Sequence, residues 1–262
     1  MVASIDNILS SFQTVTLAGM DPVKLMTRSD EKYLCRLDQL PGILETARRD
    51  FRVFEHLGKR LLGYETMYLD TSGREMYLMH HNGKLNRYKI RIREYRATHD
   101  LFFEIKFRDN HRLTTKKRIP IGPDRNYHTD EIREFMSKNT TYVPEMLNPV
   151  LFSTFERMTL VNSDIQERIT IDINPAWYFG DQRITLPNIV IMEVKSTRTS
   201  TTSGFGYLLR EARVPPRRLS KYCTGTALLF PEIKHNRFKA KLLHLKKIDK
   251  NFFYNEPFHA LI

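Results

Sequence analysis

One segment of the 262-residue chain has a strict two-residue alternation: Lys89-Ile90-Arg91-Ile92-Arg93-Glu94-Tyr95. Successive side chains of a β-strand point to opposite faces, so the basic residues and Tyr95 share one face and the isoleucines share the other. A single strand of this kind is also typical of a sheet edge whose polar face meets water. The alternation therefore predicts a strand, and other segments must decide what its cationic face meets.

The same alternation returns in residues 103–107, 168–173 and 189–195, which argues against a lone solvated edge strand. In each segment one face is apolar and the other carries charged side chains. We predict an α+β fold, in which an antiparallel β-barrel or tunnel has helices packed outside and Lys, Arg and Glu inside. Such an interior suits a polyanion together with a metal ion.

The charge of the chain supports an anionic ligand. The formal net charge is +12, and residues 84–118 hold twelve Lys and Arg against four Asp and Glu. Eight of the twelve net positive charges therefore lie on the strands with the alternating pattern. Charge alone does not distinguish nucleic acid, lipid headgroups and phosphorylated small molecules.

The hydrophobic pattern divides the chain into three regions. Residues 1–27 are predicted to form an N-terminal helical cap with a helix over 4–18, residues 28–230 the tunnel domain, and residues 231–262 a basic helical extension. The extension either docks through Phe238, Leu242 and Leu245 or contacts anionic lipid.

Within the tunnel domain, Asn82-Gly83 is predicted to be a hairpin turn. Helices are expected over 38–52 and 129–138, and a helix with a loop over 204–219. Strands are expected over 28–37, 64–70, 77–80, 85–96, 100–108, 112–121, 151–160, 167–174 and 188–196.

Cysteine spacing and hydropathy give the expected location. Cys35 and Cys223 form no metal-binding or disulfide motif, which favours a reducing compartment. The N-terminal residues do not resemble a signal peptide, and no apolar run is long enough to span a membrane. We expect a cytoplasmic protein and leave peripheral contact with a membrane open.

The sequence contains none of the common nucleotide-binding loops or nucleophile motifs. Phosphoryl transfer needs mainly charge neutralisation, in-line positioning and a divalent ion. Arg binds phosphate oxygens in a fork, and Lys supplies a movable point charge. Glu104 and Glu193 each precede a lysine by two positions and are candidate metal ligands, although a same-face ion pair with that lysine is the simpler interpretation of either one alone.

An ordered set of motifs resembles the catalytic domain of polyphosphate polymerases of the vacuolar transporter chaperone (VTC) type, which belong to the triphosphate tunnel metalloenzymes. The resemblance covers residues 28–230. Its motifs are Tyr64-Glu65-Thr66-Met67-Tyr68-Leu69-Asp70-Thr71, Arg91-x-Arg93-x-Tyr95, Glu104-x-Lys106, Phe155-x-Arg157, Arg168-Ile169-Thr170-Ile171-Asp172, Ile191-Met192-Glu193-Val194-Lys195 and Ser220-Lys221-Tyr222.

The resemblance implies an enzyme that uses Mn²⁺ or Mg²⁺ to transfer the γ-phosphoryl group of ATP to growing inorganic polyphosphate, with release of ADP. It implies Glu193 as a metal ligand, to which the residue pattern adds Glu104. The expected catalytic cations are Lys32, Arg91, Arg93, Lys106 and Lys221, and the expected substrate-binding residues are Tyr95, Arg118, Arg157, Arg168, Lys195 and Ser220. The register of Lys116, Lys117 and Arg118 stays open, except that Lys117 must face away from its two neighbours.

The chain departs from the family pattern at its first strand. Tunnel hydrolases carry Glu-x-Glu-x-Lys there, whereas this sequence reads Arg28-x-Asp30-x-Lys32. Loss of a carboxylate weakens activation of water at a second metal, which favours a polymerase over a triphosphatase that hydrolyses inorganic or organic triphosphates.

A third hypothesis is a non-catalytic module that binds polyphosphate or nucleic acid. Phe103, Ile105 and Phe107 fall on the face opposite Glu104 and Lys106, so base stacking and charge do not converge and nucleic acid is disfavoured. The resemblance also makes a separate integral-membrane partner plausible. The oligomeric state is open.

Overall fold

A curled, mostly antiparallel sheet of eleven strands organises the computed structural model, which describes residues 2–23, 29–196 and 204–249. Its hydrogen-bonded order, with every adjacent pair antiparallel, is β2 (Ser29–Arg36), β11 (Ile189–Ser196), β9 (Glu167–Phe179), β8 (Asn148–Asn162), β4 (Leu62–Asp70), β5 (Arg87–Tyr95), β6 (Asp100–Arg108) and β7 (Thr114–Ile121). Three short strands, β1 (Thr14–Val15), β3 (Arg52–Phe54) and β10 (Gln182–Thr185), extend it at β8 and β9. The expected α+β fold with an antiparallel, tunnel-like sheet is confirmed.

The two ends of this order, β2 and β7, share no hydrogen-bonded ladder among the described residues. The sheet nevertheless curls, so that the charge of Lys32 on β2 contributes to lowering the pKa of Lys106 on β6. The described strands therefore form a curled, tunnel-like sheet without a continuous barrel ladder.

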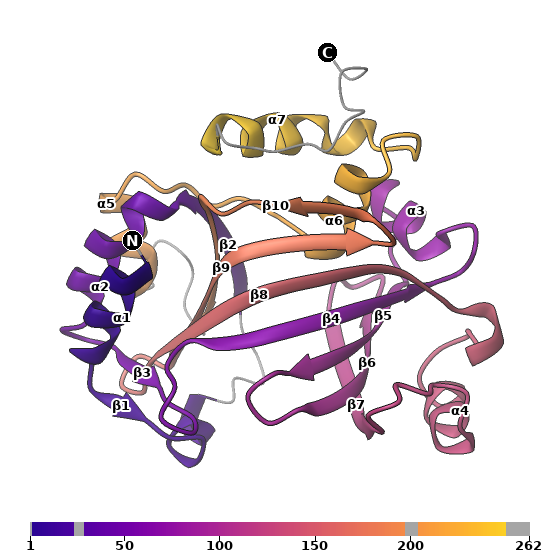
Figure 1. Cartoon of the computed structure of the whole chain (residues 1–262), viewed down its shortest axis with the longest axis horizontal. Coiled ribbons are helices and arrows are strands. Elements are labelled where there is room, and N and C mark those ends of the chain that lie inside the picture. The colour runs from indigo at the N-terminus through magenta and orange to yellow at the C-terminus, as the bar shows by residue number, and fades with distance from the viewer. Residues whose placement is uncertain (1, 24–28, 197–203, 250–262) are drawn as a thin grey trace.

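Helices cover the outer, apolar faces of the strands (Figure 1). Helices α1 (Val2–Ser10), α2 (Leu40–Ala47) and α5 (Gly204–Glu211) pack over β2, β9 and β11, with Ile169, Ile171 and Met192 fully buried beneath them. Helix α4 (Asp130–Ser137) covers β5 and β6, and its N-terminus is capped by Thr129, whose hydroxyl accepts a hydrogen bond from the Ile132 N–H at 3.4 Å. The period-two pattern thus separates a dry outer face from a charged inner face.

Three more helices close one end of the molecule: α3 (Glu75–His81), α6 (Lys221–Leu229) and α7 (Lys239–Ile248). They form an apolar cluster around Trp177 and Tyr222, into which Phe238 and Leu245 of the basic extension are packed. The four 3₁₀ segments are Ala18–Val23, Leu37–Gln39, Pro144–Met146 and Asn236–Phe238. The docked interpretation of the basic extension is correct for its described part, while residues 250–262 lie outside the described residues.

The strand expected at 77–80 and the hairpin at Asn82-Gly83 are wrong. Residues 75–81 form α3 because the Asp70 carboxylate accepts hydrogen bonds from the N–H groups of Met76 and Tyr77, both at 3.0 Å. Gly83, with φ +73°, then follows the end of α3. Helix α1 also stops at Ser10, short of the predicted residue 18, and neither α6 nor β10 was predicted.

We predict that Gly225→Ala destabilises the protein. A Cβ at Gly225 in α6 would lie 2.1 Å from Cδ1 of the fully buried Trp177. Overpacking at such a site costs about 1–3 kcal/mol, more than the helix propensity that alanine adds. Thermal unfolding should show a lower midpoint for Gly225→Ala. In the control Gly42→Ala, where no atom lies within 4 Å of the new Cβ, the midpoint should stay unchanged or rise; a rise in both variants would contradict the packing.

Candidate functional site

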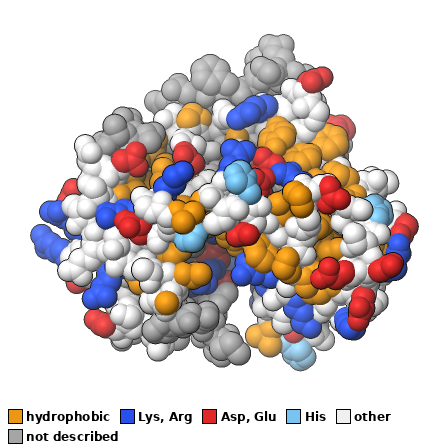
Figure 2. Space-filling model, turned by 60° about the horizontal axis from the view of Figure 1, so that its bottom comes forward, with side chains coloured by type: hydrophobic (Ala, Val, Ile, Leu, Met, Phe, Trp, Pro, Cys, Tyr) orange, Lys and Arg blue, Asp and Glu red, His pale blue; other side chains and the backbone are white. Residues whose placement is uncertain are grey.

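The inner face of the sheet lines a lumen to which strands from both halves contribute charged side chains. The underside of the molecule is hollowed, and Lys and Arg side chains gather around and inside the hollow (Figure 2). Strand register places Lys32 opposite Glu193, Arg91 opposite Glu104 and Lys89 opposite Lys106. The first pair joins segments far apart in the sequence, and the other two lie across the β5–β6 hairpin; all meet because each residue occupies an inward position of its strand.

Glu104 on β6 holds two cations at once. Its side chain is 1% exposed, and its carboxylate accepts hydrogen bonds from Arg91, at 2.7 Å from Nε and 2.6 Å from Nη2, and pairs with Lys116. Burial alone would raise the pKa of Glu104, but Arg91, Arg93 and Lys116 together hold it far below its usual range. Glu104 is therefore an ionised bridge between β5 and β7.

Asp172 on β9 has the same role on the other side of the lumen. The Arg157 guanidinium donates in a fork to its carboxylate, at 2.6 Å and 2.9 Å, and Lys221 at the start of α6 forms a second ion pair. Burial opposes ionisation, yet the two cations lower the pKa of Asp172 to about 2. The sequence motif contained Asp172, but only the β8–β9 register, which sets Asp172 opposite Arg157, reveals its function.

Glu193 on β11 is a third inner carboxylate that is held by two cations. It pairs with Lys32 on β2 and with Lys195 two positions along its own strand, and Lys195 also reaches Asp30 at 3.4 Å. The pKa of Glu193 is well below its usual value, because Lys32 and Lys195 outweigh the effect of burial. At 21% its side chain is the most exposed of the three acids.

Further cations on the inner face have no carboxylate within 4.0 Å among the described residues: Lys89, Arg93, Lys106 and Arg118. Arg93 donates to the Thr66 hydroxyl at 3.4 Å, and Lys89 to the Ser220 hydroxyl at 2.9 Å. Unpaired charges of one sign, held close together, repel one another and favour an anionic ligand.

Lys106 responds to this concentration of positive charge. Desolvation, together with the nearby charges of Lys89, Lys32 and Arg91, lowers the pKa of Lys106 to about 7 against the opposing effect of Glu193. With a pKa near neutral pH, the Lys106 amine is only partly protonated, and a bound anion favours its protonated, charged form. Lys106 is thus suited to bind a phosphate group as a movable charge.

Aromatic rings support the guanidinium groups at one part of the lumen. Arg118 lies 4.3 Å from the ring centre of Phe102 and donates to the Tyr95 hydroxyl at 3.1 Å. Arg157 lies 5.1 Å from the Phe155 ring, and the Lys221 ammonium lies 4.4 Å from the same ring. These contacts fix the directions of the cations without neutralising them.

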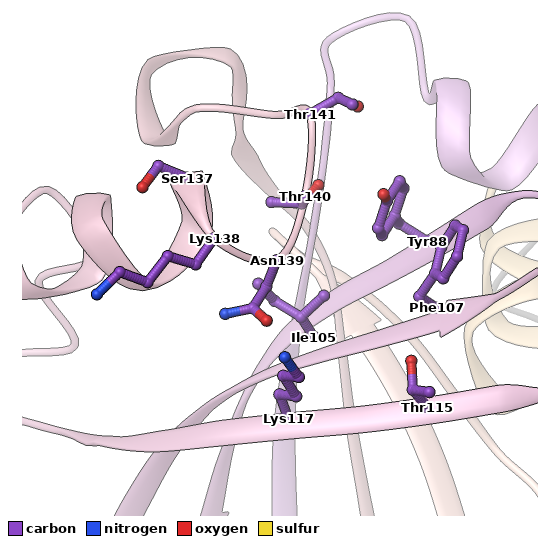
Figure 3. Close-up of a pocket in the computed structure, with 10 residues that line it drawn as sticks. All are labelled: Tyr88, Ile105, Phe107, Thr115, Lys117, Ser137, Lys138, Asn139, Thr140 and Thr141. Atoms are coloured by element: carbon purple, nitrogen blue, oxygen red, sulfur yellow. The ribbon is translucent and has the colours of Figure 1, made fainter.

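The register of β7 is now defined. Lys116 and Arg118 sit opposite Lys106 and Glu104 and share the inner face, while Lys117 sits opposite Ile105 on the outer face. Lys117 lines an outer cavity of about 470 Å³ beside α4, away from the lumen (Figure 3). The prediction that Lys117 faces away from its neighbours is confirmed, and Lys116 joins the site.

Residues at the start of α6 are placed by a buried hydrogen bond that the motifs did not reveal. Tyr222 donates its hydroxyl to Asp70, the carboxylate that also caps α3. Ser220 is the N-cap of α6 and accepts from the Cys223 N–H at 3.3 Å, so it is fixed beside Lys89. Tyr222 and Asp70 therefore act as positioning residues for Lys221 and Ser220.

Arg168 and Asp30 remain to be placed among the residues that the sequence singled out. Arg168 lies opposite Lys195 in the β9–β11 ladder, on the inner face that Asp172 shares. Asp30 is described, whereas Arg28 lies outside the described residues.

The carboxylates of the lumen suit a divalent ion that takes most of its ligands from bound phosphate. The described residues contain no group of three or more His, Cys, Asp and Glu side chains able to cage a metal. Magnesium-type ions commonly take one or two protein carboxylates and complete their shell with phosphate oxygens and water. Glu193 is ionised and accessible enough for that role, whereas Glu104 is closed off by Arg91 and Lys116.

The chain was compared with known protein families, curated proteins and solved structures. A family model described as the VTC domain matches residues 27–230. The comparison with curated proteins finds no match. No helix among the described residues has the length and apolar character that crossing a membrane requires.

Three solved structures are similar in shape at low sequence identity. A proposed adenylyl cyclase from Hippeastrum, described as having dominant triphosphatase activity, has a TM-score of 0.49 at 13% identity, covering 77% of this chain and 96% of its own. A proposed adenylate cyclase from Vibrio parahaemolyticus has a TM-score of 0.44 at 10% identity, covering 74% and 94%. A hypothetical protein from Pyrococcus furiosus has a TM-score of 0.44 at 11% identity, covering 75% and 99%.

We predict that Asp172→Asn lowers the free energy of unfolding by about 3 kcal/mol, because it leaves Arg157 and Lys221 without their buried counter-charge. The control Asp38→Asn removes an exposed ion pair with Arg36 and should change stability by less than about 1 kcal/mol. Urea unfolding measures both. Equal small losses in the two variants would show that Asp172 does not carry the charge balance of the lumen.

We predict that binding of tripolyphosphate weakens as pH rises past about 8, in part through Lys221. Burial, Arg157 and Lys32 lower the pKa of Lys221 to about 8 against the effect of Asp172, so its positive charge is present below that pH and lost above it. Arginine stays charged, so Lys221→Arg should show a shallower decline in titration calorimetry between pH 7 and 9. Tripolyphosphate itself ionises over this range, but that effect is the same for wild type and Lys221→Arg and cancels in the comparison. Affinities that depend on pH identically in the two proteins would contradict the role of Lys221.

Proposed function

This chain belongs to the VTC domain family, and from that membership we propose that it is a metal-dependent polyphosphate polymerase. It would transfer the γ-phosphoryl group of ATP to the end of an inorganic polyphosphate chain and release ADP. The observation that carries the proposal is the lumen itself, where three carboxylates each hold two cations and further cations from β5, β6 and β7 have no acid partner. A linear polyanion is the ligand that neutralises such a surface.

The inner cations have distinct roles in this proposal. Arg91 is held by Glu104 and presents a fixed guanidinium, suited to forked contact with phosphate oxygens. Arg93, Lys106 and Lys221 would neutralise the charge that spreads over the transferred group. Lys32, Arg118, Arg157, Arg168 and Lys195, with the hydroxyls of Tyr95 and Ser220, would hold the remaining phosphates in line.

Glu193 is the residue we propose as the protein ligand of Mn²⁺ or Mg²⁺. Held there, such an ion would supply positive charge that offsets part of the negative charge of the phosphates. Before it binds, Lys32 and Lys195 keep the Glu193 carboxylate ionised and fixed on β11. Glu104, which the sequence also suggested as a ligand, is better suited to holding Arg91 and Lys116.

The lumen supports transfer to phosphate better than hydrolysis. Glu104, Asp172 and Glu193 all have depressed pKa values, which makes each of them a weak base for removing a proton from water. A terminal phosphate oxygen of the polymer is already anionic and needs no base. Hydrolysis of triphosphates is the second candidate activity, and a non-catalytic polyphosphate-binding module the third.

We further propose the setting in which the enzyme works. Residues 28–230 would form the catalytic unit, residues 1–27 an N-terminal cap, and residues 231–262 an extension docked on α3 and α6. The free, buried thiols of Cys35 and Cys223 are compatible with a reducing cytoplasm. A separate integral-membrane protein is the partner we propose for passage of polymer across a membrane, and α7 is the face we propose for peripheral contact.

We predict that purified protein given ATP and Mn²⁺ or Mg²⁺ produces ADP and a ladder of polyphosphate. Arg91→Ala and Glu193→Ala should each lower the rate of polymer formation at least about 100-fold, because each removes charge stabilisation from the transferred group. Lys117→Gln removes a cation from the outer face of β7 and should retain full activity. Gel electrophoresis and phosphorus NMR resolve ADP, free phosphate and polymer.

The products decide among the candidates. Free phosphate without polymer would identify a triphosphatase, and binding without turnover would identify a binding module. Full activity of both Arg91→Ala and Glu193→Ala would reject the lumen as the active site.

A further inference from the structure

A second group of cations lies beyond the site described above, where β5 begins and β6 ends. Its members are Arg87 on β5 and Arg108 on β6, which lie opposite each other, and Lys241 on α7. The Lys241 ammonium lies 5.5 Å from the centre of the Phe238 ring, and that ring lies 6.3 Å from the His80 ring on α3. Together with Lys89, we call these residues the His80 cation cluster. None of its cations has a carboxylate within 4.0 Å among the described residues. Lys89 also belongs to the inner face of the lumen, whereas Arg87, Arg108 and Lys241 have no role in the catalytic proposal.

The strand register makes the cluster costly for the free protein. Arg87 lies directly opposite Arg108, and the next inward pair is Lys89 opposite Lys106. Like charges placed directly opposite each other on a sheet are destabilising. Two consecutive like-charge pairs without intervening acid point to a ligand that supplies the missing negative charge.

Two buried polar atoms of the cluster also have no hydrogen-bond partner in the described part of the chain. These are Nε of Arg108 and Nδ1 of His80. Burial, together with the charges of Lys89, Arg87, Lys241 and Arg108, lowers the pKa of His80 to about 2. His80 is therefore neutral at ordinary pH, and its unpartnered ring nitrogen and the Arg108 N–H are buried polar groups of the kind that are normally hydrogen-bonded.

The basic extension is held firmly enough to contribute Lys241. Phe238 packs edge-on against Tyr77 and His81, at 6.0 Å and 5.2 Å between ring centres. At the other end of α7, the Asp249 carboxylate accepts from the Asn188 backbone N–H at 3.1 Å and side-chain amide at 2.9 Å. Lys241 thus comes from a fixed helix that lies outside residues 27–230, the part matched by the family model.

The cluster continues the inner row of cations along β5. Arg93, Arg91, Lys89 and Arg87 follow one another at every second position, which spans about 20 Å of strand. That row is longer than the triphosphate of one nucleotide. Phosphates beyond the reacting triphosphate would therefore reach Arg87, Arg108 and Lys241.

We propose that the His80 cation cluster is a second binding site for linear polyphosphate, which holds phosphates of the chain beyond those bound in the central lumen. Helix α7 supplies one wall of this site through Lys241. The identity of the ligand rests on the proposed function, while the existence of an anion site rests on the unpaired cations.

Titration calorimetry without nucleotide or metal tests this site, using tripolyphosphate and long-chain polyphosphate as probes. The variants are Lys241→Gln, Arg108→Gln and their combination; Lys246→Gln is the matched control, with the same charge change on an exposed position of α7. The wild-type protein should bind the long chain more tightly than tripolyphosphate. The double variant should lose about tenfold or more in affinity for the long chain, with less than about twofold loss for tripolyphosphate, and the control should match the wild type.

Thermal unfolding of the same proteins without ligand gives a second readout. Removing like charges should leave the midpoint unchanged or raise it, so a lowered midpoint in Lys241→Gln and Arg108→Gln would mean that these cations are structural and would overturn the site. Equal loss of affinity for both probes, or no loss, would also overturn it. A protein that makes no polymer yet shows the chain-length effect would refute the proposed polymerase and leave this site intact.

Discussion

An excess of cations over carboxylates on one face of the curled sheet is the constraint on which the rest of the structure depends. Glu104, Asp172 and Glu193 are each shared by two cations, and further cations have only hydroxyl or aromatic partners among the described residues. Such an arrangement is stable only if the remainder of the fold compensates for the repulsion. It is also poised to gain free energy when a polyanion binds the folded state.

The outer layers provide that compensation. Isoleucines from β5 and β9 are buried beneath α4 and beneath α1, α2 and α5, so the strands that carry the charges are anchored from behind. At the closed end, Asp70 ties α3 to α6 through Tyr222 and thereby fixes Lys221 and Ser220. The charged lumen is therefore built on rigid elements whose stability comes from the opposite face.

Much of this could be predicted from sequence because period-two alternation determines which side chains share a face. The inward positions of Lys89, Arg91 and Arg93 follow from local pattern alone. The partners do not follow from it: Arg157 meets Asp172, and Glu104 meets Lys116, through the register of neighbouring strands, which the alternation within one strand does not determine. The pattern also failed at residues 75–81, because the carboxylate of Asp70 at the end of β4 caps a helix there, and it gave no sign that α6 would pack at the end of the sheet.

The most direct test of this account compares how tripolyphosphate and orthophosphate shift thermal unfolding at equal total phosphate and ionic strength. If the lumen is organised around a linear polyanion, tripolyphosphate should raise the unfolding midpoint by several degrees, and orthophosphate should have little effect, because only a chain can contact cations on several strands at once. Equal shifts for the two ligands, or no shift for either, would contradict the claim that these cations form one binding surface.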